Sequence, residues 1–193
     1  LGDVYKRQVR EQAALEDVSA VMEGSPCLCT VGRFSHAKGM DRAVRIAARL
    51  VEMGMKGLRW YLAGYGDEAS VRREIAAHGM EEHVVILGKK ANPYPYMAAC
   101  GLYVQPSRYE GKAVAVREAQ ILGRPVAITR FPTASGHLED GVDGVIVPND
   151  EEGAAQALFS LLHDPARLES LAAACRARDY GNRDEILKLE ALV

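Results

Sequence analysis

Two glutamates, Glu110 and Glu118, stand eight residues apart in the stretch SRYEGKAVAVREAQILGRPV (107–126). An ionised carboxylate can accept hydrogen bonds from two neighbouring hydroxyl groups at once, such as those of a ribose or a hexose. Gly111 follows the first glutamate, and a residue without a side chain lets a ligand come close to the backbone. This combination predicts a site for a ligand that is rich in hydroxyl groups.

The local structure expected around the two glutamates is a strand followed by a helix over residues 112–122. Glu110 then lies at the mouth of this helix, where the helix dipole stabilises a negative charge. Glu118 lies two turns inside, and eight residues span about 12 Å along a helix. The backbone N–H groups of Gly111 to Val114 have no partner within such a helix and can face a phosphate. The alternative interpretation is a helix cap at 110 and an ordinary solvated glutamate at 118.

A pair of cations follows the first apolar segment, in the loop GRFSHAKG (32–39). Arg33 lies where the predicted strand ends, and Lys38 lies just before a predicted helix. The free N–H groups of a helix start attract anions. Arg presents a planar fork to phosphate oxygens, whereas Lys presents a compact charge. The loop therefore predicts a phosphate site, and the alternative is two solvated surface cations.

The segment GYGDEA (64–69) matches G-x-G-x-x-A, a dinucleotide fingerprint, between a predicted strand and a predicted helix. It keeps open an enzyme that uses a nicotinamide cofactor. Two observations weaken that interpretation. The segment follows the second predicted strand rather than the first, and the next strand ends in GKK (88–90) without an acid to hold a ribose 2′-OH. A tight turn from strand to helix also explains the two glycines.

Apolar runs alternate with segments of helical periodicity along the chain. The predicted strands are residues 27–34, 58–64, 83–88, 101–107, 125–130 and 144–148, and the predicted helices are residues 40–54, 67–79, 94–100, 112–122, 150–164 and 165–178. Strands that alternate with helices form a parallel sheet covered on both faces, so we predict a Rossmann-like α/β domain. Such sheets bind ligands at the carboxyl ends of their strands, where the loops described above begin.

The size and composition are those of a globular domain. The chain has 193 residues, of which 48% are hydrophobic and 26% charged, and its formal net charge of −2 speaks against nucleic-acid binding. No apolar run approaches the roughly 20 residues that span a bilayer, and no signal peptide is visible. The four cysteines predict buried, reduced thiols, with Cys27 and Cys29 on one side of a strand.

Taken together, the loops resemble the carboxyl-terminal half of the retaining glycosyltransferases of family 4, which have the two-domain GT-B fold. The resemblance covers about residues 26–180. The matching pieces, in the order and spacing of that family, are VGRFSHAKG (31–39), YLAGYGDE (61–68), VVILG (84–88), LYVQPSRYEGKAVAVREAQILGRPV (102–126) and DGVDGVIVP (140–148). The pair of glutamates with an upstream Arg and Lys is a more specific combination than the glycine motif alone.

This resemblance implies roles for individual residues. Arg33 and Lys38 hold the diphosphate of a nucleotide-sugar donor and stabilise the leaving group. Glu118 binds the ribose hydroxyls, and Glu110 takes a catalytic, nucleophile-like position beside the donor sugar. The strand end around Leu87 and Lys89 lies where the nucleobase stacks.

The segment after the first glutamate departs from the family. Gly111, Lys112, Ala113 and Val114 supply the expected backbone contacts to sugar and phosphate, but the common form is Gly-Phe-Pro rather than Gly-Lys-Ala. The departure leaves the transferred sugar open.

For the whole protein, the resemblance implies transfer of a hexose-type sugar with retention, from a nucleotide-sugar for which UDP is the commoner carrier. The acceptor is a sugar, a lipid-linked glycan or a small molecule of polysaccharide or glycoconjugate synthesis. It binds through an amino-terminal domain that lies outside this chain, so this chain should be inactive alone. We expect no cofactor and no metal, because the cations do the neutralising and there is no Asp-x-Asp motif. The expected location is cytoplasmic, at the inner face of the membrane if the complete enzyme is peripheral.

The expected organisation is a remnant of an upstream region over residues 1–25, the donor domain over 26–180 and an amphipathic helix over 181–193. The first eight residues show little periodicity and receive no predicted element. Three alternatives stay open at this point. They are an NAD(P)-dependent oxidoreductase domain, a non-catalytic module that binds nucleotide-sugars, and a sugar-phosphate synthase or epimerase on the same fold.

Overall fold

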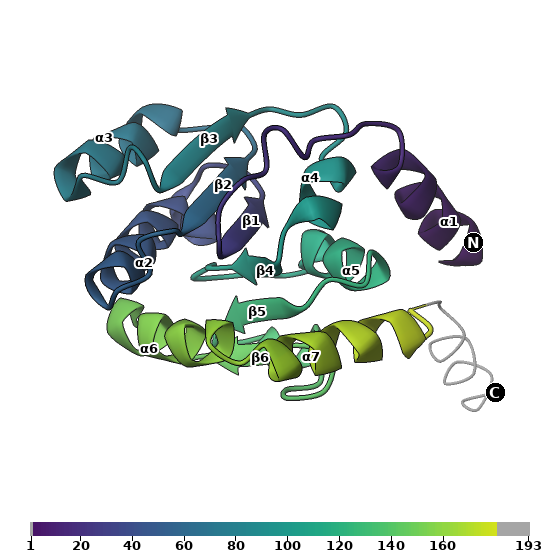
Figure 1. Ribbon diagram of the computed structural model, residues 1–193. Coiled ribbons are helices and arrows are strands. Elements are labelled where there is room, and N and C mark those ends of the chain that lie inside the picture. The colour runs from purple at the N-terminus through teal and green to yellow at the C-terminus, as the bar shows by residue number, and fades with distance from the viewer. Residues whose placement is uncertain (1, 181–193) are drawn as a thin grey trace.

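The computed structural model describes residues 2–180 of the 193-residue chain, and the helix expected over 181–193 lies outside them. The centre of the fold is a six-stranded sheet in the order β3-β2-β1-β4-β5-β6, and every neighbouring pair of strands is parallel (Figure 1). The strands are β1 (Cys27–Val31), β2 (Arg59–Ala63), β3 (Val84–Gly88), β4 (Leu102–Gln105), β5 (Val126–Thr129) and β6 (Val145–Val147).

This strand order confirms the Rossmann-like α/β prediction. The chain builds outward from β1 to β3, returns across the sheet, and builds in the other direction from β4. The switch point therefore lies between β1 and β4, where loops leaving the two carboxyl ends diverge and open a crevice. The loops that carry Arg33 and Glu110 leave at this place.

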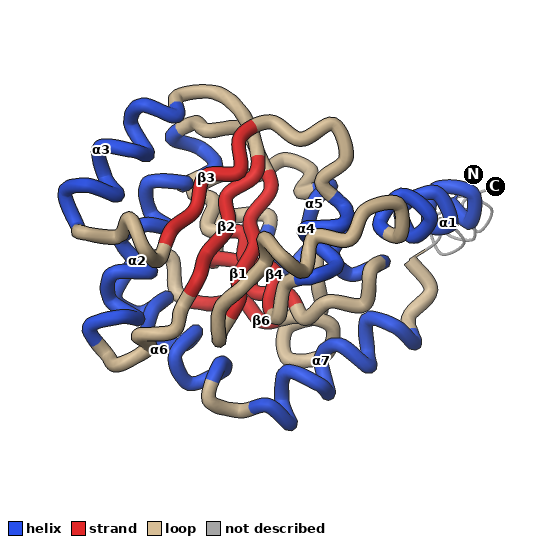
Figure 2. The backbone as a smooth tube through the Cα atoms, turned by 45° about the horizontal axis from the view of Figure 1, so that its top comes forward, coloured by secondary structure: helices blue, strands red, loops and turns tan. Residues whose placement is uncertain are grey.

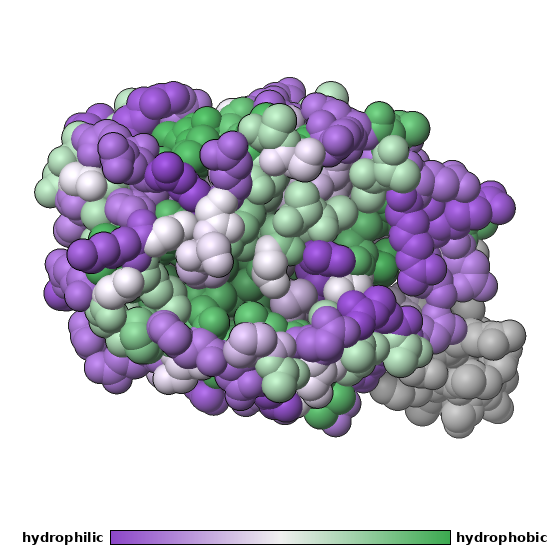
Figure 3. Space-filling model, viewed as in Figure 1, coloured by the Kyte–Doolittle hydropathy of each residue, from purple (hydrophilic) through white to green (hydrophobic). Residues whose placement is uncertain are grey.

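Helices cover both faces of the sheet, as Figures 1 and 2 show. The helices are α1 (Gly2–Ala13), α2 (Met40–Glu52), α3 (Glu68–His78), α4 (Tyr94–Ala99), α5 (Val114–Ile121), α6 (Glu151–Leu162) and α7 (Pro165–Ala177). On one face α2 packs against α3 and α6, and on the other α1 packs against α4 and α5. Hydrophilic residues predominate on α1 and around the rim of the molecule, whereas apolar residues show between them over the sheet (Figure 3).

Each strand contributes side chains to two cores, because successive residues of a strand point to opposite faces. Leu28 belongs to the core under α2 and α6, whereas Cys27 and Cys29 belong to the core under α4 and α5. All four cysteines are buried and free, as predicted. Trp60 is fully buried, and its Nε1 donates to Thr30 Oγ1 at 2.9 Å.

Two differences from the predicted helices concern the site and the amino-terminal segment. Helix α1 occupies Gly2–Ala13, where no element was expected, and α5 begins at Val114 rather than near Lys112. We attribute the later start of α5 to hydrogen bonds with a distant part of the chain. The amides of Arg108 and Tyr109 both donate to Ala37 O (2.8 and 3.3 Å), which holds the preceding segment in an irregular loop.

The predicted separation of about 12 Å assumed that one helix joins the two glutamates. It is not supported, because residues 111–113, three of the seven between the glutamates, precede the helix. The amide of Val114 also donates to Lys112 O at 3.0 Å, so this N–H group is not available to a phosphate in the way that was expected.

Within residues 2–180, none of the helices is both long and apolar enough to cross a bilayer. The same residues contain no group of three or more His, Cys, Asp or Glu side chains that could hold a metal ion.

Candidate functional site

A pocket of about 570 Å³ opens at the carboxyl ends of β1, β2 and β3, beside the start of α5. Six of the residues predicted from the sequence line it, namely Arg33, Lys38, Lys89, Lys112, Val114 and Glu118. Four other predicted residues, Leu87, Glu110, Gly111 and Ala113, do not line it. The two cations of the first loop and the second glutamate thus share one cleft, and the first glutamate lies behind it.

The charge of this pocket is strongly positive. Its lining holds five cationic side chains and one acidic side chain, contributed by Arg33, Lys38, Lys89, Lys90, Lys112 and Glu118. A cleft lined by one sign of charge concentrates the field within it and attracts ligands of the opposite charge. The pocket is therefore suited to a polyanion such as a diphosphate.

Lys38 connects the pocket to the buried first glutamate. Its Nζ lies 2.8 Å from Glu110 Oε1 and 2.6 Å from Glu110 Oε2. The Lys38 side chain is 30% exposed, whereas that of Glu110 is only 3% exposed. Because Lys38 both lines the pocket and pairs with Glu110, a negative charge bound in the pocket would interact with the same cation as the buried carboxylate.

A ladder of polar side chains fixes the orientation of Glu110 from the inside of the sheet. Ser107 Oγ donates to Glu110 Oε1 at 2.6 Å, and Gln105 Nε2 donates to the same oxygen at 3.2 Å. Gln105 Oε1 in turn accepts a hydrogen bond from the Tyr103 hydroxyl at 2.7 Å. Residues 103, 105 and 107 alternate, so their side chains leave β4 and its extension on one side.

Sequence reasoning missed this ladder, although it left a signal. Polar Gln105 and Ser107, and the hydroxyl of Tyr103, stand at every second position of a strand whose other residues are apolar. Burial raises the pKa of Tyr103, so its hydroxyl keeps its proton and acts as the donor at the end of the ladder. The consequence is a carboxylate whose Oε1 is occupied by three donors and whose Oε2 faces Lys38.

The second glutamate is held by tyrosines. Glu118 Oε1 accepts hydrogen bonds from Tyr94 Oη at 2.8 Å and from Tyr5 Oη at 2.6 Å. Burial, followed by the hydrogen bond to Glu118, raises the pKa of Tyr94 to about 12, so it remains a donor at neutral pH. No sequence feature had singled out either tyrosine.

Tyr65 projects from the second loop into the pocket. It is half-exposed, and its ring lies 5.7 Å from the Arg33 guanidinium and 5.4 Å from Lys89 Nζ, measured to the ring centroid. Cations at such distances over a tyrosine face are attracted by its π-electrons. The ring therefore helps to position Arg33, predicted to contact phosphate, and Lys89, predicted to lie near the nucleobase.

The glycines beside Tyr65 have a structural explanation. Gly64 and Gly66 have φ values of 156° and 132°, and a Cβ at Gly64 would lie 1.8 Å from Gly32 O. Phe34 N donates to Tyr65 O at 2.7 Å across the same contact. Only glycine allows the two loops to approach so closely. The motif thus secures the loop that carries Arg33, which accounts for it without a dinucleotide.

Residues 25–164 match the family model described as glycosyl transferases group 1. The chain belongs to this family. The alpha-D-kanosaminyltransferase of Streptomyces kanamyceticus is 29% identical over 174 residues, which are 88% of this chain and 43% of that protein. The lipopolysaccharide core biosynthesis glycosyltransferase LpsE of Rhizobium meliloti is 28% identical over 142 residues, which are 72% of this chain and 40% of that protein. The chain therefore spans less than half the length of these curated relatives.

Solved glycosyltransferase structures share the fold. The structure of HepE from Anabaena in complex with UDP has a TM-score of 0.73 and 18% identity, and it covers all of this chain (100%) and 54% of that chain. The carboxyl-terminal domain of the group 1 protein LpcC from Francisella tularensis has a TM-score of 0.68 and 16% identity, over 77% of this chain and 82% of that one. These neighbours identify the fold as that of GT-B glycosyltransferases, and the nicotinamide alternative is not favoured.

Proposed function

We propose that this chain is the donor-binding half of a retaining, family 4 glycosyltransferase and that its cationic pocket holds the nucleotide part of a UDP-sugar. The observation that carries the proposal is the position of Lys38, which lines the pocket and pairs with the buried Glu110. One cation can then contact the diphosphate while it stays within reach of the acid beside the sugar. The occurrence of UDP in a structural neighbour supports uridine as the base.

The proposed mechanism follows from the charges that develop during transfer. Breaking the bond between sugar and diphosphate leaves negative charge on the diphosphate and positive charge at the anomeric carbon. Arg33 and Lys38 stabilise the first charge, and Glu110 Oε2 stabilises the second. Glu118 binds the ribose hydroxyls, held in place by Tyr94. We propose that these residues suffice without a metal ion or cofactor.

The remaining predicted site residues would contact the two ends of the donor, the nucleobase and the sugar. In this proposal Leu87 and Lys89 contact the nucleobase at the end of β3, and the loop of Gly111, Lys112 and Ala113 contacts the sugar. The relatives include the alpha-D-kanosaminyltransferase and the amylovoran biosynthesis glycosyltransferase AmsK of Erwinia amylovora. This range supports transfer of a hexose-type sugar in glycoconjugate or polysaccharide synthesis. In this proposal the acceptor is held mainly by a partner domain, without which the chain is inactive.

Calorimetric titration of the chain with UDP and with NADH tests the proposal. We expect UDP to bind and NADH not to bind. Arg33→Ala should weaken UDP binding by about 10- to 150-fold, because loss of a charge-assisted hydrogen bond costs about 1.5–3 kcal/mol. Arg73→Ala, which removes an exposed cation from α3, is the matched control and should leave the affinity unchanged. Equal UDP affinity of the Arg33 variant and the control, or preference for NADH, would refute the proposed function.

A further inference from the structure

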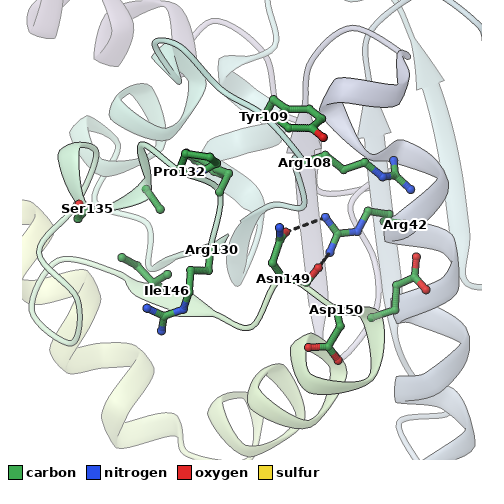
Figure 4. Close-up of a pocket in the computed structure, with 12 residues that line it drawn as sticks. Arg42, Arg108, Tyr109, Arg130, Pro132, Ser135, Ile146, Asn149 and Asp150 are labelled. Atoms are coloured by element: carbon green, nitrogen blue, oxygen red, sulfur yellow. Dashed lines mark hydrogen bonds between the residues drawn. The ribbon is translucent and has the colours of Figure 1, made fainter.

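A second and larger pocket, of about 740 Å³, lies at the carboxyl ends of β4, β5 and β6 (Figure 4). It shares no lining residue with the proposed donor pocket. The loop that carries Glu110 separates the two, because Tyr109 lines the second pocket and Glu110 pairs with Lys38 of the first. The proposed donor site leaves this second pocket without a role.

The cations of this pocket are only partly compensated. Its lining holds three arginines, Arg42, Arg108 and Arg130, and two acids, Asp150 and Glu151, which leaves a formal excess of one positive charge. Each acid is already engaged within the fold. Asp150 Oδ1 accepts from Gly153 N at 2.7 Å, and Glu151 Oε1 accepts from an arginine of α2 at 3.1 Å.

Arg42 is a buried cation on the wall formed by α2. It is 3% exposed, and within the described residues its guanidinium donates to neutral oxygens alone. The shortest of these bonds reach Asn149 O at 2.6 Å and Asn149 Oδ1 at 3.0 Å. Burial, and then the nearby charge of Arg108, lower the pKa of Arg42. The positive charge of this wall therefore lacks a carboxylate in direct contact.

Arg130 stands across the pocket from Arg42 and Arg108, on the same side as Ser135 (Figure 4). It is exposed, and its side chain makes no hydrogen bond or ion pair with any residue between 2 and 180. Arg108 differs, because both of its terminal nitrogens contact Asp41, at 2.8 and 2.7 Å. Arg130 is thus the guanidinium of this pocket that an incoming anion can reach without breaking an internal pair.

The other lining groups suit a sugar. Tyr109 is 62% exposed and offers an aromatic ring, while Ser135 and Asn149 offer a hydroxyl and an amide. The segment after β5, which lines the pocket, also contacts the loop of the first glutamate, since Thr133 Oγ1 donates to the backbone O of Glu110 at 2.7 Å. A molecule bound here would lie directly behind the loop that carries the proposed catalytic acid.

We propose that this pocket binds a sugar or polyol bearing a phosphate or carboxylate group, as the charged part of the acceptor. The inference rests on the proposed function, because it takes the acceptor to be the second substrate of a glycosyltransferase. Arg130 holds the oxyanion, since a guanidinium fork matches phosphate and carboxylate oxygens. Ser135, Asn149 and Tyr109 hold the hydroxyl groups and the apolar face of the ring.

The test follows backbone amide NMR signals of the chain during titration with glucose 6-phosphate, glucuronate, glucose and inorganic phosphate. We expect at least one of the two charged sugars to shift signals around Arg130 and Asn149, and the identity of that sugar distinguishes phosphate from carboxylate. Arg130→Ala should weaken this binding by about tenfold or more. The variant removes no side-chain hydrogen bond or ion pair within residues 2–180, and Arg130 is exposed, so we expect the fold to be retained. Arg73→Ala should bind like the unchanged protein.

Three results would overturn the inference. They are the absence of shifts with both charged sugars, equal affinity of Arg130→Ala and Arg73→Ala, and inorganic phosphate or glucose binding as tightly as the charged sugars. The UDP titration on the same samples separates the two proposals. If UDP still binds and depends on Arg33 while the charged sugars do not bind, this inference fails and the proposed donor site stands.

Discussion

Removing one partner of the Lys38–Glu110 pair should reveal both its structural and its ligand-binding role. Lys38→Met leaves a carboxylate that is only 3% exposed without its cation. Breaking a fully buried pair costs about 3–5 kcal/mol. Two donors remain, Ser107 and Gln105, and Lys38 was already 30% exposed. We therefore expect a smaller loss, of about 2–3 kcal/mol.

Urea unfolding and thermal melting measure this loss. In a domain of this size 1 kcal/mol corresponds to about 2–4 °C, so the melting temperature of Lys38→Met should fall by about 4–12 °C. Glu110→Gln should cost less, about 1 kcal/mol, because Lys38 can turn toward solvent in the pocket. The double variant should be more stable than Lys38→Met, since it no longer buries an unpaired charge.

UDP affinity gives the second readout and should distinguish the two single variants. Lys38→Met removes the proposed contact with the diphosphate and should weaken UDP binding severalfold. Glu110→Gln releases Lys38 from its partner and should leave UDP binding equal or stronger. The reasoning fails if Lys38→Met melts with the unchanged protein, or if Glu110→Gln weakens UDP binding as much as Lys38→Met does.

Three further predictions concern single side chains. Gly64→Ala should lower the melting temperature strongly, because its Cβ would lie 1.8 Å from a backbone oxygen, whereas Gly111→Ala, with no atom within 4 Å, should melt close to the unchanged protein. Burial would raise the pKa of Asp41, but its contact with Arg108 lowers it below 3.8 overall. The ionised Asp41 carboxylate therefore stabilises the fold above about pH 4, and this stabilisation is lost as the pH falls through the lower pKa of the folded state. Asp41→Asn should thus flatten the acid side of a plot of urea stability against pH. An unchanged plot would contradict this. Tyr94→Phe should cost less than about 1 kcal/mol of stability and weaken UDP binding in calorimetry, because the pocket carboxylate loses a donor; unaltered UDP affinity would speak against a ribose role for that carboxylate.

Local patterns were sufficient to predict the layers and elements of the sheet. Strand β2, for example, is apolar and buried from Trp60 to Ala63, and helix ends carry their own signals. Asp67 Oδ1 accepts a hydrogen bond from Ser70 N at 3.0 Å at the start of α3, and Gly79 ends the helix with a φ of 63°. These features depend on neighbouring residues, so the sequence displays them directly.

The pairings within the site could not be predicted, because they join distant parts of the chain. Lys38 and Glu110 are 72 residues apart and meet only because β4 lies beside β1. The start of α5 was misplaced for a similar reason, since hydrogen bonds to Ala37 override the local helical preference before Val114. The tyrosines that hold Glu118 come from two other helices, α1 and α4, whose packing no local pattern specifies.

The ladder from Tyr103 through Gln105 and Ser107 anchors Glu110 to the interior of β4 rather than to the loop around it. The next residues, Gly111 and Lys112, are exposed, and space around Gly111 is open. The orientation of the Glu110 carboxylate thus depends on buried residues of β4 and its extension, whereas the exposed residues around it belong to the loop. If the proposed donor site is right, substitutions in the outer loop would change the sugar that is accepted, while the orientation of the buried carboxylate would stay the same.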